Sequence, residues 1–284
     1  MTKLHMGIDL GSVSLNIALI DETGDIKAST YRRTEGRPLP LLLHALEELS
    51  AEFDLFEGIV VTGSGRKLVS HALQVPDINE IVTQAAGTCH FYPNVRTIVE
   101  IGGQDAKFTT LQNGRVTSSI MNNVCAAGTG SFIEEQAQKL GCALARISAL
   151  SEHRQSPLAS DRCTVFMERD INHYLSRGYS VNEVLAAVLH SVVENYLGKV
   201  AIESSIGDTI TFQGATAKIK SLVAVMEQRL QKPIHVSRFC HLTGAMGCAL
   251  ALADQGALGA VVRLVADDGP ENRTAGGTDA RALL

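Results

Sequence analysis

Three apolar-rich runs stand near the start of the chain, at residues 3–10, 12–20 and 26–33, each bounded by polar turn residues. Runs of this length with β-branched and apolar residues are typical of strands. Gly11-Ser12 follows the first run, and the sequence Asp-Glu-Thr-Gly follows the second. The pattern therefore predicts an antiparallel meander of three strands.

The same plan recurs about 90 residues further along the chain. Residues 95–120 contain a strand, a glycine turn, a second strand, an Asn-Gly hairpin and a third strand. An aspartate accompanies the glycines both times: Asp9 with Gly11, and Asp105 with Gly102 and Gly103. The repetition predicts two related lobes that face each other across a cleft.

Much of the remaining chain carries apolar residues at helical spacing, three and four positions apart. The predicted helices cover residues 42–53, 78–90, 129–140 and a long amphipathic run at 181–204, with two more after Gly214 and Gly244. Short strands are expected at 58–62 and 208–214. We expect a first lobe over residues 1–94, a second over 95–254 whose final helix returns to the first lobe, and an extension over 255–284 that ends in a disordered tail.

The composition is that of an ordinary globular protein, with 45% hydrophobic and 19% charged residues among 284. The formal net charge of −5 comes without a basic stripe, which argues against nucleic acid as the main ligand. No apolar run reaches the roughly 18 residues of a membrane span, and Asp9 interrupts the apolar N-terminus too early for a signal peptide. We therefore expect a cytoplasmic protein that binds neither nucleic acid nor a membrane.

The two glycine turns predict a site for nucleotide phosphates. Glycine has no Cβ to hold an anion away from the backbone N–H groups. The predicted phosphate cradle consists of Gly11, Ser12, Gly102 and Gly103. Asp9 and Asp105 would hold Mg²⁺ through its waters, and Gln104 would orient the attacking water. A glycine beside an aspartate is common in plain turns, so it is the duplication that favours a phosphate clamp.

Two further glycines, Gly214 and Gly244, precede predicted helices and would make room for adenosine. Together with the two phosphate loops, they resemble the actin, Hsp70 and sugar-kinase superfamily, which implies a two-lobed, ribonuclease H-like α/β fold. The Walker A spacing of P-loop proteins is absent from the sequence. A Rossmann dinucleotide site is also disfavoured, because Gly11 lies between two strands rather than before a helix.

The six cysteines contain no C-x-x-C pair, and a reducing compartment favours free thiols over disulfides. Cys125 precedes the helix predicted at 129–140, and Cys163 precedes an apolar run. A thiolate at a helix N-terminus is stabilised by the helix dipole. The other four cysteines lie in small apolar contexts, where buried and inert thiols are expected. Two ligands are too few for an iron–sulfur cluster, but a two-fold dimer would bring four thiolates to one shared 4Fe-4S cluster.

A more specific resemblance rests on five motifs: GIDLGS, VTGSGR, YPNVRTIVEIGGQDAKF, MNNVCAAGTGSF and CTVFMERDI. In this order they resemble the ATP-dependent activator family of 2-hydroxyacyl-CoA dehydratases, over about residues 5–254. Relatives of that family are the ATPase subunits of benzoyl-CoA reductase and the reductases of double-cubane cluster proteins. The resemblance implies a homodimer in which Cys125 and Cys163 of both chains hold one 4Fe-4S cluster. It also implies that ATP hydrolysis drives a low-potential electron into an iron–sulfur partner enzyme, with ferredoxin or flavodoxin as the upstream donor.

The chain departs from that family's usual pattern at several places. These are Val13 and Asn16 in the first phosphate loop, Thr83-Gln84, Asn123-Val124 before Cys125, and Gln213 to Thr216 at the adenosine loop. We infer that the redox ATPase chemistry is kept while nucleotide or partner handling is altered. Two other functions stay open: a small-molecule kinase of the same superfamily with Asp105 as general base, and a nucleotide-gated scaffold without electron transfer.

Overall fold

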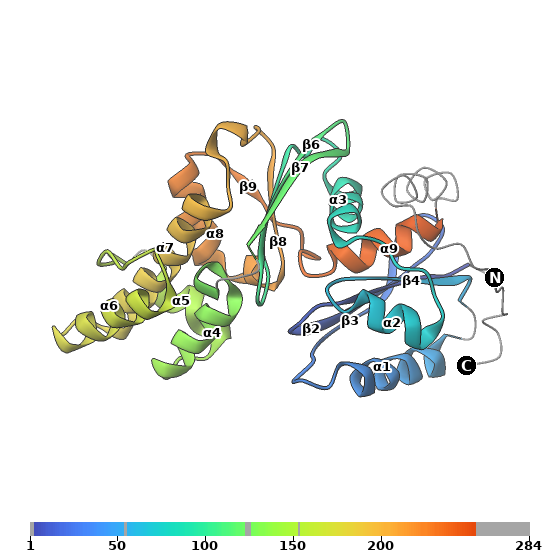
Figure 1. Ribbon diagram of the computed structural model, residues 1–284, viewed down its shortest axis with the longest axis horizontal. Coiled ribbons are helices and arrows are strands. Elements are labelled where there is room, and N and C mark those ends of the chain that lie inside the picture. The colour runs from blue at the N-terminus through green and yellow to red at the C-terminus, as the bar shows by residue number, and fades with distance from the viewer. Residues whose placement is uncertain (1–2, 54–55, 123–125, 153, 254–284) are drawn as a thin grey trace. The chain divides into compact units, whose positions relative to one another are not determined.

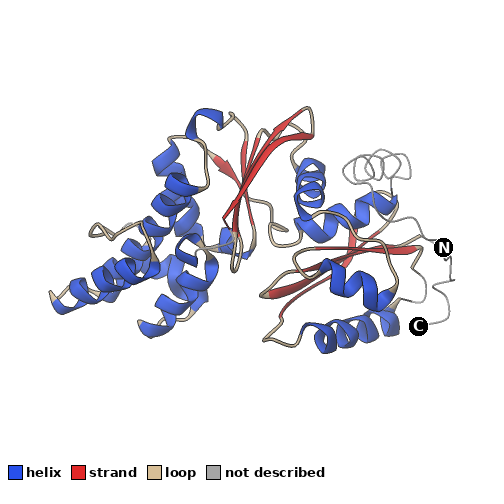
Figure 2. Ribbon diagram, in the orientation of Figure 1, coloured by secondary structure: helices blue, strands red, loops and turns tan. Residues whose placement is uncertain are grey.

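The first four strands form a mixed sheet in the order β3-β2-β1-β4 (Figures 1 and 2). The computed structural model describes residues 3–53, 56–122, 126–152 and 154–253. The strands are β1 (His5–Leu10), β2 (Ser14–Ile20), β3 (Ile26–Arg33) and β4 (Gly58–Thr62). Strands β1, β2 and β3 are antiparallel neighbours, which confirms the predicted meander, and β4 pairs with β1 in parallel.

Helices cover both faces of this sheet. They are α1 (Pro38–Glu52), α2 (Arg66–Leu73), α3 (Glu80–Phe91) and α9 (Thr243–Ala253). Ile8 of β1 belongs to the same buried cluster as Leu42 of α1 and Val69 of α2. Gly7 faces the other way, because side chains alternate along a strand. A Cβ on Gly7 would lie 1.8 Å from the carbonyl oxygen of Ala245, so the glycine allows α9 to lie directly against β1.

A second mixed sheet repeats the plan in the order β7-β6-β5-β8-β9. Its strands are β5 (Thr97–Ile101), β6 (Ala106–Gln112), β7 (Arg115–Asn122), β8 (Ile210–Gln213) and β9 (Ile234–His235). Strands β5, β6 and β7 are antiparallel, and β8 pairs with β5 in parallel, as β4 does with β1. The β6–β7 hairpin turns at Asn113 and Gly114, with φ of 52° and 74°. The predicted duplication of the strand plan is therefore confirmed, whereas β9 was not expected from the sequence.

The helices that pack with the second sheet surround α7 (Val181–Lys199). They are α4 (Gly130–Lys139), α5 (Ile147–Ser151), α6 (Thr164–Ser176) and α8 (Lys220–Leu230). Helix α7 begins at a capping box in which Ser180 and Glu183 satisfy each other's backbone N–H groups. The prediction that this run is amphipathic is wrong for residues 184–189, which are all buried because helices pack around α7 on several sides.

Helix α7 also ends earlier than the predicted position 204. The N–H groups of Val200 and Ala201 both donate to the carbonyl oxygen of Tyr196, at 2.9 and 3.1 Å, and this shared acceptor closes the last turn. Two other helices also start at positions that differ from the predicted ones. Helix α8 begins at Lys220, after a 3₁₀ turn over Ala215–Lys218, and α9 begins at Thr243, one residue before Gly244.

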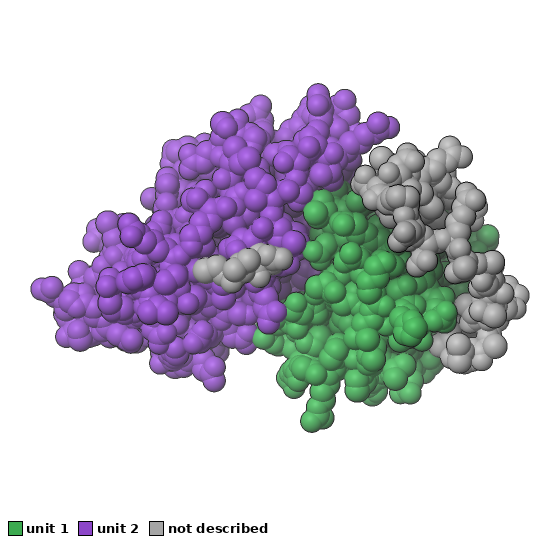
Figure 3. Space-filling view, in the orientation of Figure 1, with its two compact units in different colours: residues 1–87, 242–284 green, residues 88–241 purple. Residues whose placement is uncertain are grey.

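The chain divides into two compact units (Figure 3). One consists of Met1–Gly87 together with the chain from Leu242 onward, and the other consists of Thr88–His241. The first unit is thus assembled from two separate parts of the sequence, and its second part includes α9. Among the described residues, no helix has both the length and the apolar composition needed to span a membrane.

Candidate functional site

Asp9 lies near the end of β1, opposite Asn16 of β2 and Thr62 of β4. Two glycines of the first unit enclose its carboxylate. A Cβ on Gly63 would lie 2.4 Å from Oδ1 of Asp9, and a Cβ on Gly244 would lie 2.4 Å from Oδ2. Because real Cβ atoms do not approach that closely, both positions must be glycine if the carboxylate is to keep its place. Sequence reasoning named Gly244 only for adenosine and did not single out Gly63.

Buried hydroxyl groups line the same side of the first unit. Thr62 donates to the carbonyl oxygen of Ile78 at 2.9 Å, and its hydroxyl lies 3.0 Å from that of Thr83. Thr243 donates to Oε1 of Gln84 at 2.6 Å. The pair Thr83-Gln84, which departs from the family pattern, therefore belongs to a polar layer close to Asp9 and the start of α9.

The two predicted phosphate turns share one hydrogen-bond pattern. The N–H of Gly11 donates to the carbonyl oxygen of Ser14 at 2.9 Å, and the N–H of Gly102 donates to that of Asp105 at 2.8 Å. Each first glycine thus closes its own turn. Ser12 is exposed, and its hydroxyl lies 3.2 Å from that of Ser64.

The turn from Gly102 to Asp105 is held by the start of α4. The N–H groups of Gly130 and Ser131 donate to the carbonyl oxygens of Gly102 and Gly103, both at 2.8 Å. A Cβ on Gly130 would lie 2.9 Å from Cγ2 of Thr216 and 3.1 Å from the oxygen of Gly102. Only glycine at position 130 permits this approach, so the glycine turn and the N-terminus of α4 are joined by their backbones.

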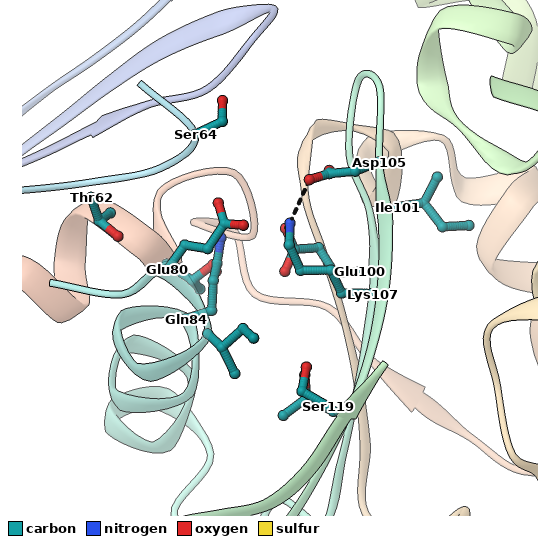
Figure 4. A network of polar contacts seen from close by, with 12 residues as sticks. Thr62, Ser64, Glu80, Gln84, Glu100, Ile101, Asp105, Lys107 and Ser119 are labelled. Atoms are coloured by element: carbon teal, nitrogen blue, oxygen red, sulfur yellow. Dashed lines mark hydrogen bonds and ion pairs between the residues drawn. The ribbon is translucent and has the colours of Figure 1, made fainter. Parts of the chain in front are cut away.

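Asp105 forms an ion pair with a lysine that sequence reasoning missed. Nζ of Lys107 lies 2.9 Å from Oδ2 of Asp105 and 3.0 Å from Oε1 of Glu100. Figure 4 shows Glu100 on β5, Lys107 on β6 and Asp105 in the turn between these strands. Glu100 is the cross-strand partner of Lys107. Lys107 is only 3% exposed, whereas Gln104 in the same turn is exposed.

Gly214 and Thr216 lie beside the end of β5. Gly214 has a φ of 88°, and a Cβ there would lie 2.7 Å from the carbonyl oxygen of Ile101. Thr216 donates its hydroxyl to the same carbonyl oxygen at 2.6 Å. The N–H of Gly214 donates to the carbonyl oxygen of Cys240 at 2.9 Å. The predicted adenosine loop is therefore bonded to the strand that leads into the second phosphate turn.

Of the two candidate cluster ligands, Cys125 lies outside the described residues. Cys163 occupies the N-cap position of α6 and is half-buried. The carbonyl oxygen of Arg162, just before it, accepts from Nδ2 of Asn195 at 3.3 Å and from Nζ of Lys199. Asn195 also donates to the carbonyl oxygen of Asp161. Helix α7 thus fixes the backbone that leads into Cys163.

The other four cysteines were all expected to be buried. Cys240 and Cys248 are buried, and burial raises the pKa of both thiols. The expectation is wrong for Cys89 and Cys142, which are half-buried. Within the described ranges, no group of three or more histidine, cysteine, aspartate and glutamate side chains could hold a metal ion.

The structure thus joins the predicted residues in two sets, one in each unit. In the first unit, the carboxylate of Asp9 lies against Gly244. In the second, Gly102 lies against Asp105, Gly103 binds the start of α4, and Gly214 lies against Ile101. Lys107, Glu100 and Gly63 complete these sets; all three lie inside the quoted family motifs, but the sequence assigned them no role. For Lys107 and Glu100, the signal in the sequence would have been two opposite charges on neighbouring buried strands. For Gly63, it would have been a glycine directly after a strand.

Comparison with known proteins identifies the family. The model of the BadF/BadG/BcrA/BcrD ATPase family matches residues 6–251. The chain belongs to this family. It is 33% identical to the activator of lactoyl-CoA dehydratase from Anaerotignum propionicum over 251 residues, which are 86% of this chain and 95% of the relative.

Two solved structures of dehydratase activator components align with most of the chain. Component A of (R)-2-hydroxyglutaryl-CoA dehydratase from Acidaminococcus fermentans has a TM-score of 0.81 and 26% identity, covering 90% of this chain and 99% of its own. The activator of 2-hydroxyisocaproyl-CoA dehydratase from Clostridium difficile, with bound ADPNP, has a TM-score of 0.78 and 28% identity, covering 96% and 100%. A ROK family glucokinase from Streptomyces griseus, at 12% identity and a TM-score of 0.55, shares the fold alone. The predicted actin and sugar-kinase-like fold and the predicted family are confirmed.

Proposed function

We propose that this member of the ATPase family is a reductive activator. It would hydrolyse ATP to ADP and phosphate and pass one low-potential electron from a 4Fe-4S cluster, shared by two chains, to an iron–sulfur partner enzyme. The names of its relatives, which activate acyl-CoA dehydratases, support such a dehydratase as the partner. A double-cubane cluster protein is the other partner that we propose. Ferredoxin or flavodoxin would supply the electron.

One observation carries this proposal. The amides of Gly130 and Ser131, at the start of α4, hold the carbonyl oxygens of Gly102 and Gly103 at 2.8 Å. The turn proposed to meet the nucleotide phosphates is therefore bonded to the helix that follows the segment of Cys125. Any movement of that turn on ATP binding or hydrolysis must move α4 or break these bonds, which gives a direct route from nucleotide state to the cysteine segment.

The nucleotide would bind through the two aspartates and the residues of the glycine turns. We propose that Asp9 and Asp105 hold Mg²⁺ through its waters, that Gly11, Ser12, Gly102 and Gly103 meet the phosphates, and that Gly214 and Gly244 accommodate adenosine. The amides of Gly103 and Gln104 have no acceptor among the described residues, so they are the backbone donors of the second turn that remain for an anion. Gln104 is exposed and would orient the attacking water.

We propose that each chain supplies half of a cluster site. Cys163 presents a half-buried thiol at the N-cap position of α6. With Cys125 it would supply two of the four ligands that a 4Fe-4S cluster takes, so two chains are needed for one cluster. When bound, the cluster supplies a one-electron carrier whose potential depends on nearby hydrogen bonds and solvent exposure.

The test is anaerobic purification and reconstitution, with iron and sulfide counted per chain, EPR spectra, native mass and ATP hydrolysis. We expect a dimer with one cluster per two chains, and loss of the cluster in Cys125→Ser and Cys163→Ser. Cys142→Ser is the matched control, since it removes a half-buried thiol of the same unit and should keep the cluster. An iron-free monomer after reconstitution would refute the proposal. ATP consumption stimulated by a small hydroxylated or carboxylated compound would instead indicate a kinase.

A further inference from the structure

We propose that Lys107 positions Asp105 for its role at the nucleotide-bound Mg²⁺, and that Glu100 anchors the ammonium group that does so. This inference rests on the proposed function, which assigns Asp105 to Mg²⁺. Lys107 itself would touch neither the metal nor the nucleotide. Its part would be to hold one carboxylate oxygen so that the other is presented to the ligand.

The register of the strands brings the three charges together. Lys107 on β6 is the cross-strand partner of Glu100 on β5, and Asp105 lies two residues before Lys107. Residues two apart along a strand share one face, and directly opposite residues are near neighbours. The resulting distances from Nζ are 3.0 Å to Oε1 of Glu100 and 2.9 Å to Oδ2 of Asp105 (Figure 4).

The two carboxylates differ in exposure, and this difference assigns their roles. The side chain of Glu100 is 10% exposed and that of Asp105 is 28% exposed, while that of Lys107 is 3% exposed. Glu100 is therefore the buried partner that keeps the ammonium in place. Asp105 is the partner that solvent and a ligand can reach.

The ion pair engages Oδ2 of Asp105, while Oδ1 lies beside Gly102 in the glycine turn. Oδ2 is bonded to Lys107, and Oδ1 lies 2.6 Å from where a Cβ of Gly102 would stand. The carbonyl oxygen of Asp105 accepts the N–H of Gly102 at 2.8 Å, so the backbone of the residue is fixed as well. Because Asp105 is held through Oδ2 and through its backbone, its carboxylate is preorganised and needs no reorientation when a hydrated cation binds.

Helix α7 holds the backbone of Lys107. The hydroxyl of Tyr196 donates to the carbonyl oxygen of Lys107 at 2.8 Å. A tyrosine hydroxyl is protonated at neutral pH and can donate, and burial raises the pKa of Tyr196 further. Strand β6, which begins directly after Asp105 and carries Lys107, is thereby bonded to the central helix of its unit.

Removing Lys107 has two separable effects. Asp105 loses the bond that orients it, and Glu100 loses its counter-ion in a buried place, which is costly for stability. Loss of a residue that orients a metal-binding carboxylate typically weakens metal binding by about 10–100-fold. The two effects can be distinguished because the first lowers the affinity for Mg²⁺ and the second lowers the free energy of unfolding.

The experiment compares the wild type, Lys107→Met, the double variant Glu100→Gln/Lys107→Met, and Lys139→Met. Lys139 is the matched control, because it also bridges two carboxylates of the same unit, Glu135 at 2.8 Å and Glu168 at 2.7 Å, but on the surface. ATP hydrolysis is measured against free Mg²⁺ at saturating ATP, and ADP binding is measured calorimetrically with and without Mg²⁺. Thermal melting reports the stability of each variant.

We expect the free Mg²⁺ concentration for half-maximal hydrolysis to rise by about 10-fold or more in both Lys107 variants. Metal-free ADP affinity should stay within about twofold of the wild type in both, and Lys139→Met should change neither quantity. If Lys107→Met fails to fold, the double variant tests the inference instead, because Glu100→Gln removes the buried charge that has lost its lysine partner. A double variant with wild-type Mg²⁺ dependence would overturn the inference and leave Lys107 as a counter-ion of Glu100 alone. A wild-type protein without Mg²⁺-dependent hydrolysis would instead refute the proposed function.

Discussion

Replacing Gly244 by alanine tests whether the position of the Asp9 carboxylate governs ATP hydrolysis. The added Cβ would lie 2.4 Å from Oδ2 of Asp9, 3.1 Å from its Cγ and 3.2 Å from Nε2 of Gln84. Normal contacts between such atoms are about 3.5 Å, so the carboxylate must move by about 1 Å. Gly63 borders the other carboxylate oxygen, Oδ1, which would lie 2.4 Å from a Cβ at position 63. The displacement therefore falls on a carboxylate that glycines border on both sides.

A displacement of about 1 Å at a group that positions a reactant typically lowers the rate about 100-fold. The loss of stability should be much smaller, about 1 kcal/mol, because the clash falls on the end of a side chain and a helical Gly→Ala change gains about 0.5–1 kcal/mol. The assay is kcat for ATP hydrolysis at saturating Mg²⁺, together with a urea unfolding curve. Gly198→Ala is the control, since its Cβ would meet nothing within 4 Å. A Gly244→Ala protein with a wild-type rate would refute the reasoning.

Two further predictions concern the second unit. Asn195→Ala should lower the free energy of unfolding by about 1–3 kcal/mol, because the carbonyl oxygens of Asp161 and Arg162 lose a buried donor; an unchanged urea midpoint would contradict this. Burial and the charge of Lys218 lower the pKa of His241 to about 4. The folded state therefore binds a proton less readily than the unfolded state, whose histidine has a pKa of about 6.5. The stability contributed by the neutral His241 is lost as pH falls from about 6.5 towards 4. The Tm of His241→Gln, relative to the Tm of the wild type, should therefore be higher at pH 4.5 than at pH 7.5. A Tm difference that does not change with pH would disprove the assignment.

Local sequence signals were sufficient for much of the fold. The meander β1–β3 is bounded by turns that the composition marks, and the β6–β7 hairpin turns at an Asn-Gly pair with positive φ. Helix α7 begins at Val181, where the periodicity of apolar residues predicted its start. Each of these features depends on residues a few positions apart, which is why a single sequence reveals it.

The missed features depend on contacts between distant positions. Helix α2 has only eight residues and no side-chain cap, and the two-residue strand β9 exists only as a partner of β8. Lys107 resembles any lysine of an exposed strand until the β5–β6 register places it opposite Glu100. Gly63 and Gly244 are about 180 positions apart, and only the fold shows that they enclose one carboxylate.

The divided first unit also sets an order for biosynthesis. Helix α9 lies on β1 so closely that a Cβ on Gly7 would touch its backbone, yet α9 follows the whole of Thr88–His241 in the chain. At about 5–20 residues per second, a ribosome needs roughly 8 to 30 seconds to make that intervening part. The second unit can complete its own sheet during this interval. The face of the first sheet that α9 covers in the folded protein stays exposed until α9 has been made. A nascent chain halted just after His241 should therefore expose that face to chaperones, and one extended beyond α9 should bury it.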